Sequence, residues 1–152
     1  MINISYIFEQ INKDLPIKLL KDQKDIKKFI GIFKDASPKY NSPDVDIYAV
    51  VDENHRFKFV GGVVINKKPK IDIYKQFKLK PEVVVSFVYV MSAYRKHQLG
   101  LRLLRIPMEK YKSIGLTTNK NWTRPQAYRV YEHLGFKEIK STGVTSYWYW
   151  EK

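Results

Sequence analysis

The chain has no cysteine among its 152 residues, which excludes disulfide bridges, thiolate metal ligands and a cysteine nucleophile. Its three histidines, His55, His97 and His133, lie far apart in the sequence, without the spacing of a metal site. No apolar run is long enough to span a bilayer, and the first residues lack the basic-then-apolar pattern of a signal peptide. From these absences we expect a cytoplasmic protein that is not associated with a membrane and holds no metal.

Acidic residues are scarce. The chain has 28 Lys and Arg residues against 15 Asp and Glu residues, a formal net charge of +13. From Arg95 to Arg129 the chain has nine basic residues and one acidic residue, Glu109, which gives this stretch a net charge of +8. Such an excess is compatible with a merely soluble surface, or with an anionic partner such as nucleic acid or a phosphorylated cofactor. Its concentration in one stretch favours a phosphorylated cofactor as part of the explanation.

The length and the 44% hydrophobic content predict one globular domain over residues 1–152. An edge strand is expected within residues 5–20. Hydrophobic periodicity then predicts a helix over 22–34, a hairpin of strands 47–51 and 57–65, and a central strand covered on both faces over 83–91. The next predicted elements are a helix over 99–112, stopped by Gly115, and a strand over 114–118. They are followed by a helix that Thr123 caps and Gly135 ends, and by a last hairpin of strands 137–139 and 145–150.

A short basic loop, Tyr94 to Gly100, lies between the central strand and the next helix, which it opens. The first N–H groups of a helix have no intrahelical partner, and the helix dipole favours negative charge there. The loop is therefore suited to phosphate groups, and a cofactor-binding enzyme is the leading interpretation. No nucleophile elbow, Walker motif or dinucleotide-binding motif is present.

Two stretches, VMSAYRKHQLG at 90–100 and AYRVYEHLGF at 127–136, resemble the GNAT superfamily of N-acetyltransferases. Members typically carry a strand ending in V-x-P-x-Y-R, a loop of pattern Q/R-x-x-G-x-G/A, and a later A-x-x-x-Y-x-x-x-G-F. The chain departs from these patterns at Ser92, in place of proline, and at Gln98, in place of the first glycine. The resemblance implies an α/β (α+β) fold with a mixed, mostly antiparallel central sheet flanked by helices.

The same resemblance implies acetyl-CoA as co-substrate and transfer of its acetyl group to an amine by direct attack, without a covalent enzyme intermediate. Backbone amides from Gln98 to Leu101 would bind the pyrophosphate, and the strand near Val88 and Val90 would pair with the pantetheine arm. The full set of implied cofactor-binding residues is Val88, Val90, Arg95, Lys96, His97, Gln98, Leu99, Gly100, Leu101 and Asn121.

Tyr131 occupies the position at which family members often use a tyrosine as general acid for the leaving thiolate. It also lies on an apolar helical stripe, so a packed core tyrosine is the alternative. The central strand has no carboxylate to act as base; its polar side chains are Ser86 and Tyr89, which complete the candidate catalytic set. Glu82 and Asp72 lie outside that strand, so a water chain could remove the amine proton instead.

The acceptor stays open at this stage. A basic surface disfavours a lysine-rich acceptor and favours an acidic protein, a nucleotide or a nucleic acid. One alternative is a nucleobase-modifying enzyme similar to the phage Mom type, which implies DNA modification. Another is a non-catalytic basic domain that only binds a partner. The last predicted strand, Ser146 to Trp150, could also pair across a dimer, so an oligomer is compatible with the sequence.

Overall fold

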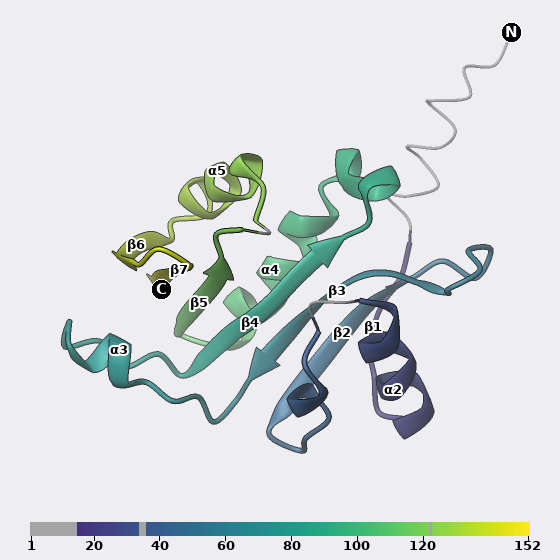
Figure 1. Ribbon diagram of the computed structural model, residues 1–152, viewed down its shortest axis with the longest axis horizontal. Helices are drawn as coiled ribbons and strands as arrows, with labels where there is room; N and C mark the ends of the chain where they lie inside the picture. Colours follow the sequence, from purple (N-terminus) through teal and green to yellow (C-terminus); the bar gives the residue numbers. More distant parts are fainter. Residues whose placement is uncertain (1–14, 34–35, 122) are drawn as a thin grey trace, which may run out of the picture.

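The computed structural model describes residues 15–33, 36–121 and 123–152. The described strands form one sheet of seven in the order β1-β2-β3-β4-β5-β7-β6 (Figure 1). Neighbouring strands are antiparallel except β4 and β5, which run parallel. The strands are β1 (Ile17–Leu19), β2 (Val45–Val51), β3 (Phe59–Asn66), β4 (Val83–Val90), β5 (Ser113–Asn119), β6 (Lys137–Ser141) and β7 (Thr145–Glu151).

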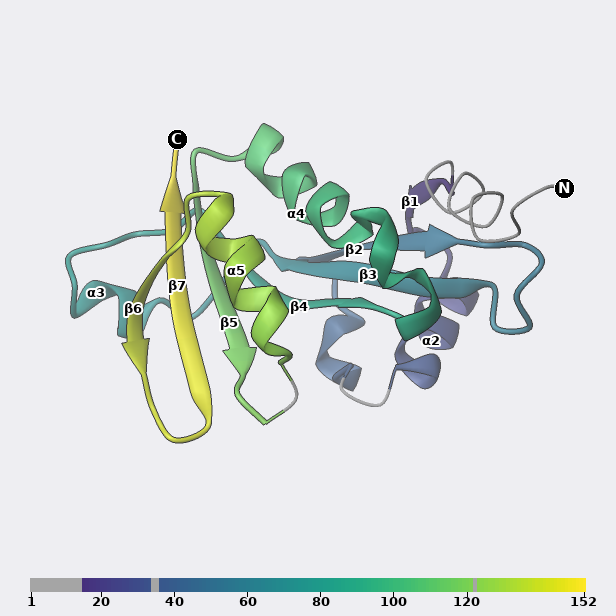
Figure 2. The same cartoon turned by 90° about the horizontal axis from the view of Figure 1, so that it is seen from above.

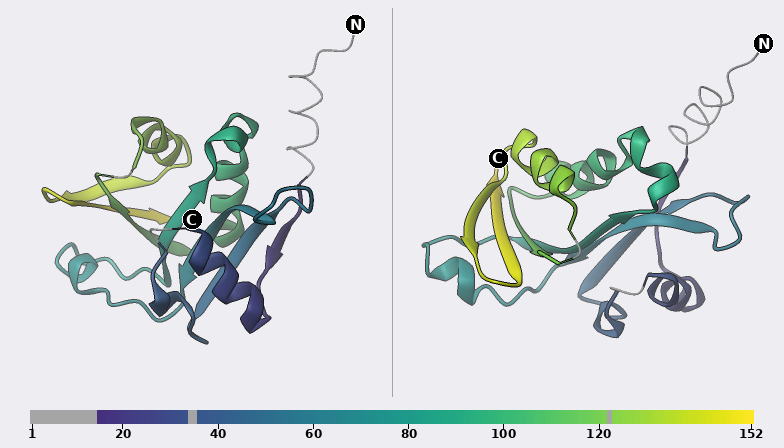
Figure 3. Two further views of the ribbon diagram at one scale, coloured as in Figure 1. Left: turned by 45° about the vertical axis from the view of Figure 1, so that its right-hand side comes forward. Right: turned by 45° about the horizontal axis from the view of Figure 1, so that its top comes forward.

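Helices cover both faces of this sheet. They are α2 (Gln23–Ile32), α3 (Asp72–Lys75), α4 (Leu99–Lys110) and α5 (Pro125–His133), with 3₁₀ helices η1 (Pro38–Tyr40) and η2 (Ser92–His97). Helices α4 and α5 lie on one face and α2 and α3 on the other (Figures 2 and 3). The α+β fold predicted from the sequence, a mostly antiparallel sheet flanked by helices, is confirmed.

The core is correspondingly divided in two. Leu99, Leu103 and Leu104 of α4 pack with Tyr131 of α5 against one face of the sheet, in a cluster that includes Val85. Phe29 of α2 and Phe33, the C-cap residue of that helix, pack against the other face, together with Phe59 and Phe87. Each cluster therefore marks one face of the sheet.

Strands β4 and β5 separate soon after they meet. Their register pairs only Val83–Val85 with Ile114–Leu116, after which the strands diverge (Figure 1). Strand β5 stays paired with β7 to Asn119, while β4 stays paired with β3 to Val90. A β-bulge contributes to the divergence: Ile65 of β3 faces Val85 and Val64 faces Phe87, which leaves Ser86 as the extra residue. Because a bulge bends its strand and increases the local twist, a gap opens between the carboxyl ends of β4 and β5.

Most predicted elements are confirmed within the described residues. The edge strand is β1, while residues 5–12 and Lys34 of the predicted elements lie outside the described residues. Helix α2 begins where predicted, because the Asp22 side chain accepts a hydrogen bond of 2.8 Å from the Lys24 amide. Gly135 ends α5 with a φ of 96°, a left-handed conformation that glycine adopts readily.

Two local predictions are wrong. The N-cap of α5 is Arg124, without a side-chain cap, because the Thr123 hydroxyl instead donates a hydrogen bond of 2.7 Å to the carbonyl oxygen of Asn119 at the end of β5. Helix α4 ends at Lys110, so Gly115 does not stop it. Gly115 lies inside β5, where an added Cβ would come 2.6 Å from the Tyr74 ring, so this glycine makes room for a buried tyrosine.

No helix in the described ranges has both the length and the apolar character needed to cross a membrane. A group of three or more His, Asp or Glu side chains able to hold a metal is also absent from the residues that the structure describes.

Candidate active site

A cavity of about 950 Å³ occupies the gap between the diverging ends of β4 and β5. Residues of both strands, of η1 and of η2 form part of its walls. The N-terminal parts of α4 and α5, and the side of α5 that faces the sheet, form the rest of the helical wall. The described residues that line it are Tyr40, Ser86, Phe87, Val88, Tyr89, Val90, Ser92, Arg95, Gly100, Leu104, Thr117, Thr118, Asn119, Thr123, Arg124, Gln126, Ala127, Val130, Tyr131 and Thr145.

The cavity passes through the plane of the sheet. Successive strand residues point to opposite faces. Val88 belongs to the cluster beneath α4 and α5, whereas Phe87 belongs to the cluster beneath α2, yet both line the cavity. We therefore distinguish two arms. The α4–α5 arm is lined by Val88, Val90, Gly100, Leu104, Ala127, Val130 and Tyr131, and the α2 arm by Tyr40, Phe87, Tyr89 and Arg95.

The turn from η2 into α4 bounds the α4–α5 arm. Gln98 is the N-cap of α4 with φ 56° and ψ 21°, and its side chain makes no capping hydrogen bond. The first intrahelical bond runs from the Arg102 amide to the Gln98 carbonyl oxygen, at 3.1 Å. The amides of Leu99, Gly100 and Leu101 therefore precede the helical ladder and are available to an anion.

Gly100 keeps the space at this turn open. It lines the cavity, and a Cβ added to it would meet no other atom within 4 Å. The protein's own packing thus does not require glycine there. A group as bulky as a phosphate could approach the backbone at this position without displacing a side chain.

A partly buried hydrogen bond joins the same turn to the loop behind it. The Tyr94 hydroxyl in η2 donates a hydrogen bond of 2.6 Å to the carboxylate of Asp52, in the loop between β2 and β3. Burial, with this hydrogen bond as a second cause, raises the pKa of Tyr94 to about 12. Nothing in the sequence indicates this contact: Tyr94 belongs to the V-x-P-x-Y-R pattern, but its partner Asp52 lies 42 residues away and outside any motif.

Tyr131 lies in the wall of the α4–α5 arm and is only 3% exposed. Its ring packs against Tyr128, Phe136 and Trp148, with centroids 6.1, 6.4 and 5.6 Å away. Burial raises the pKa of Tyr131 well above its usual value, with a smaller contribution from Tyr128. Its hydroxyl is therefore held protonated at neutral pH, as a hydrogen-bond donor in an apolar wall.

Thr118 supplies a further polar atom that the sequence analysis did not single out. It lines the cavity from β5, it is 8% exposed, and its hydroxyl has no hydrogen-bond partner in the described part of the chain. Buried hydroxyls are nearly always satisfied by protein, water or ligand. This one lies beneath the surface of the cavity and is left unsatisfied within the described residues.

Ser86 and Tyr89 line the cavity as well. Ser86 is the bulged residue, and its carbonyl oxygen accepts a hydrogen bond of 3.2 Å from the Tyr40 hydroxyl. Tyr89 is 37% exposed and packs against Phe33 and Phe87 on the α2 face. The three candidate catalytic residues therefore border one cavity, with Tyr131 in one arm and Tyr89 in the other.

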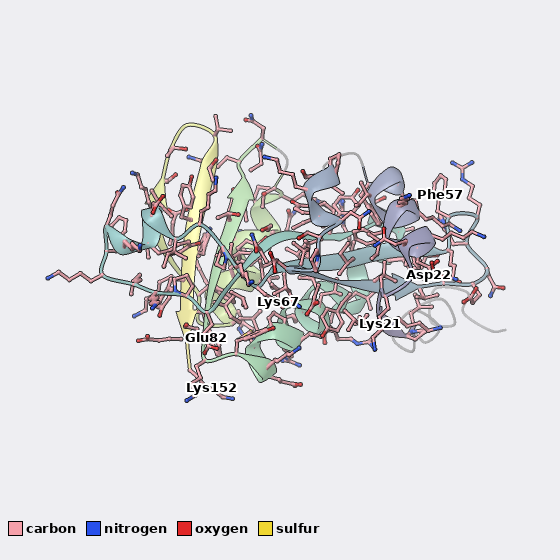
Figure 4. The ribbon with its side chains drawn as sticks, turned by 90° about the horizontal axis from the view of Figure 1, so that it is seen from below. Lys21, Asp22, Phe57, Lys67, Glu82 and Lys152 are labelled. Carbon is pink, nitrogen blue, oxygen red and sulfur yellow. The ribbon has the colours of Figure 1, made fainter. Side chains whose placement is uncertain are left out.

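The two carboxylates considered as alternatives to a base on the central strand lie away from the cavity. Glu82 precedes β4 and accepts a hydrogen bond of 2.8 Å from the Lys112 amide, and Figure 4 shows it beside Lys152, where β4 begins. Asp72 is in the short helix α3. Neither lines the cavity, and the described lining residues include no carboxylate.

The remaining predicted cofactor residues take different positions. Gln98, Leu99, Leu101 and Asn121 are not among the lining residues, and the Leu99 side chain is fully buried in the core. The Asn121 amide donates to the Asn119 side chain at 2.9 Å, and it is Asn119 that lines the cavity. The Lys96 and His97 side chains lie outside what the structure describes.

Comparison with known proteins identifies the family. The model of the acetyltransferase (GNAT) family matches residues 12–136. The chain therefore belongs to the GNAT family and is an acetyltransferase of this type, as the sequence motifs predicted. No curated protein sequence matches the chain.

Several solved structures share the fold. Arabidopsis thaliana NAA60 in complex with a bisubstrate analogue superposes with a TM-score of 0.68 at 14% identity, over 90% of this chain and 99% of that one. The same protein in complex with acetyl-CoA gives 0.66 at 15% identity, over 90% and 98% of the two chains. The ribosomal-protein-S18-alanine N-acetyltransferase from Escherichia coli gives 0.64 at 15% identity, over 90% and 92%. At these identities, the likeness establishes the fold.

Proposed function

We propose that the protein binds acetyl-CoA in the α4–α5 arm of the cavity. It then transfers the acetyl group to an amine that enters through the α2 arm. The observation that carries the proposal is the open gap between β4 and β5, which has the first amides of α4 on one side and Tyr131 in its wall. A gap that passes through the sheet lets two substrates meet from opposite faces.

The chain offers one group for each part of the cofactor. The amides of Leu99, Gly100 and Leu101 suit the pyrophosphate, because they combine free N–H groups with the positive end of the helix dipole. Beyond Val85, the edge of β4 that faces the gap is not paired with β5. Its backbone groups near Val88 and Val90 can pair with the amides of the pantetheine arm.

The proposed reaction needs little more than placement. The amine nitrogen forms a bond to the thioester carbonyl carbon, and the bond from that carbon to sulfur breaks. Holding the two groups together provides most of the rate advantage. A backbone N–H of the unpaired β4 edge polarises the carbonyl oxygen.

Tyr131 acts on the leaving sulfur in this proposal. A thiol has a pKa of about 8.5, well below that of a buried tyrosine. The Tyr131 hydroxyl therefore stabilises the developing thiolate mainly by donating a hydrogen bond. Since no carboxylate is among the described lining residues, water leads the amine proton away to solvent.

The absence of cysteine gives a clean test of this function. Coenzyme A released from acetyl-CoA would be the only thiol in the assay, so a thiol reagent reports turnover without a protein background. We expect thiol release that depends on an added amine and saturates with acetyl-CoA. A broad amine panel that never exceeds the rate without amine would contradict the proposal. It would then favour a binding domain, which a salt-dependent nucleic-acid binding series would test.

A further inference from the structure

The α2 arm combines aromatic rings with positive charge. The rings of Tyr40 and Tyr89 flank Phe87, with centroids 6.3 and 6.2 Å from it. The charged side chains among the described lining residues are Arg95 and Arg124, both basic. Such walls accept an apolar or planar group together with a negative charge, and they repel a second cationic group on the acceptor.

Arg95 is held in place within this arm. Its Nε donates a hydrogen bond of 2.7 Å to the Val90 carbonyl oxygen, and its guanidinium lies 5.1 Å from the centre of the Tyr89 ring. These two contacts orient the side chain before any ligand binds, which lowers the entropic cost of binding. Stacking on an aromatic face is a property of arginine that lysine does not reproduce.

The charge of Arg95 is not neutralised within the described part of the chain. The ion pairs found there join Lys67 to Asp46 and Lys68 to Asp44, away from the cavity. Apart from the Nε bond, Arg95 makes no other hydrogen bond to the described residues. Its two terminal nitrogens are therefore available to form a paired contact with a carboxylate or phosphate.

We propose that the acceptor is an amine that also carries a carboxylate or phosphate group, and that Arg95 binds this anionic group in the α2 arm. The inference rests on the proposed function, because it deepens the acceptor half of the same site. It assigns Arg95 to the acceptor instead of the cofactor phosphates, because the guanidinium lies over Tyr89 on the α2 face. The net charge of +13 would attract such an acceptor from solution.

Matched acceptor pairs test this assignment. Phenylalanine is compared with phenylalaninamide, and phosphoethanolamine with ethanolamine, so that each pair differs in its anionic group and the two pairs separate carboxylate from phosphate. Initial rates of thiol release give kcat/KM per unprotonated amine, which corrects for the different amine pKa values. The proteins are the native chain, Arg95→Gln, Arg95→Lys and the control Arg105→Gln, which removes the same charge from an exposed position of α4 that does not line the cavity.

We expect the anionic member of at least one pair to exceed its neutral partner by about tenfold or more in the native chain and in Arg105→Gln. The preference should disappear in Arg95→Gln and recover in part in Arg95→Lys, while the KM for acetyl-CoA stays within about twofold in all four proteins. The inference is overturned if neutral members react equally well, if the preference survives in Arg95→Gln, or if neither pair reacts while other amines do. If Arg95→Gln loses acetyl-CoA affinity but keeps the preference for the anionic acceptor, Arg95 binds the cofactor phosphates instead.

The failure of the underlying function would look different. In that case acetyl-CoA would not bind to the native chain, or no amine of a broad panel would release thiol. The pairs would then show no reaction in any of the four proteins, and the acceptor assignment would fall together with the function.

Discussion

The backbone amide of Phe136 donates a hydrogen bond of 2.9 Å to the carbonyl oxygen of Tyr131, and the two rings pack edge to face with centroids 6.4 Å apart. This is the pairing by which a helix ends at a left-handed glycine, here Gly135, with an apolar contact across the turn. It explains in physical terms why a tyrosine is followed four and five residues later by glycine and phenylalanine. The end of α5 fixes the tyrosine that faces the cavity.

Replacing Tyr131 with phenylalanine keeps this packing and removes only the hydroxyl. We predict that kcat falls by about a hundredfold, because the thiolate loses its hydrogen-bond donor. The dissociation constant for acetyl-CoA should change by less than about threefold, as measured by calorimetry.

Tyr128→Phe is the matched control. Tyr128 is in the same helix and stacks on Trp148 at 5.8 Å, but it does not line the cavity. Its kcat should match that of the native chain. If Tyr131→Phe loses cofactor affinity or stability while keeping kcat, Tyr131 is a core residue and not the hydrogen-bond donor to the leaving sulfur.

Gly100→Ala tests the turn at the start of α4. The added methyl group meets no protein atom within 4 Å, so the free energy of unfolding should hold or rise by up to about 1 kcal/mol. Because the methyl group points into space that we assign to phosphate, acetyl-CoA affinity should fall at least tenfold. Gly31→Ala in α2 is equally open and should gain stability with unchanged affinity. Equal cofactor affinity in the two variants would place the phosphates elsewhere.

Gln98→Gly removes backbone strain from the same turn. A residue with a side chain at φ 56° costs about 1–2 kcal/mol relative to ordinary helical backbone, part of which glycine loses again through its flexibility when unfolded. We predict a net gain of about 1 kcal/mol in urea unfolding and acetyl-CoA binding that is preserved or tighter.

Lys58→Gly serves as the control for Gln98→Gly, since Lys58 has a φ of 68° and does not line the cavity. It should gain similar stability without any change in affinity. A severe loss of acetyl-CoA binding in Gln98→Gly alone would show that the Gln98 side chain itself is needed at the turn.

Tyr94→Phe breaks the hydrogen bond to Asp52 behind the turn. At pH 8 we predict a loss of about 1–2 kcal/mol in the free energy of unfolding, and weaker cofactor binding because the turn is less rigid. The pKa of Tyr94 is raised to about 12 in the folded state. Its contribution is therefore fully present below pH 10 and is lost as the pH rises from about 10 to 12, because only the unfolded chain has released the proton.

Urea unfolding of both proteins across this range checks the sign. The difference between native chain and Tyr94→Phe should shrink as the pH rises above 10. A difference that stays constant or grows would mean that the hydroxyl is not the group that titrates.

The sequence was sufficient for the order of the strands and of α2, α4 and α5, whose residues follow regular patterns, but it did not predict α3, η1 or η2. The apolar run at 83–91 predicted the central strand, and Gly135 predicted the end of α5. Local propensity failed where a contact with another element decides. Thr123 bonds to the carbonyl of Asn119 instead of capping a helix, and Gly115 makes room for Tyr74.

The site itself was predictable only in part. Val88, Val90, Gly100 and Tyr131 were expected from the motif and line the cavity, and Ser86 and Tyr89 line it as well. Other features of the site depend on how the strands pair and diverge. They are the bulge at Ser86, the position of Arg95 over the Tyr89 ring, and the buried Thr118 hydroxyl. That register is a non-local property, so no short pattern in the sequence reports it.

Calorimetric titration of the native chain with acetyl-CoA, beside coenzyme A alone, shows whether the gap between β4 and β5 holds the cofactor. We predict one site per chain with a dissociation constant in the micromolar range at moderate salt. Both ligands should bind, because the pyrophosphate and pantetheine contacts are common to them. The absence of detectable heat with either ligand, at concentrations up to the millimolar range, would contradict the claim that the gap between β4 and β5 is an acetyl-CoA site.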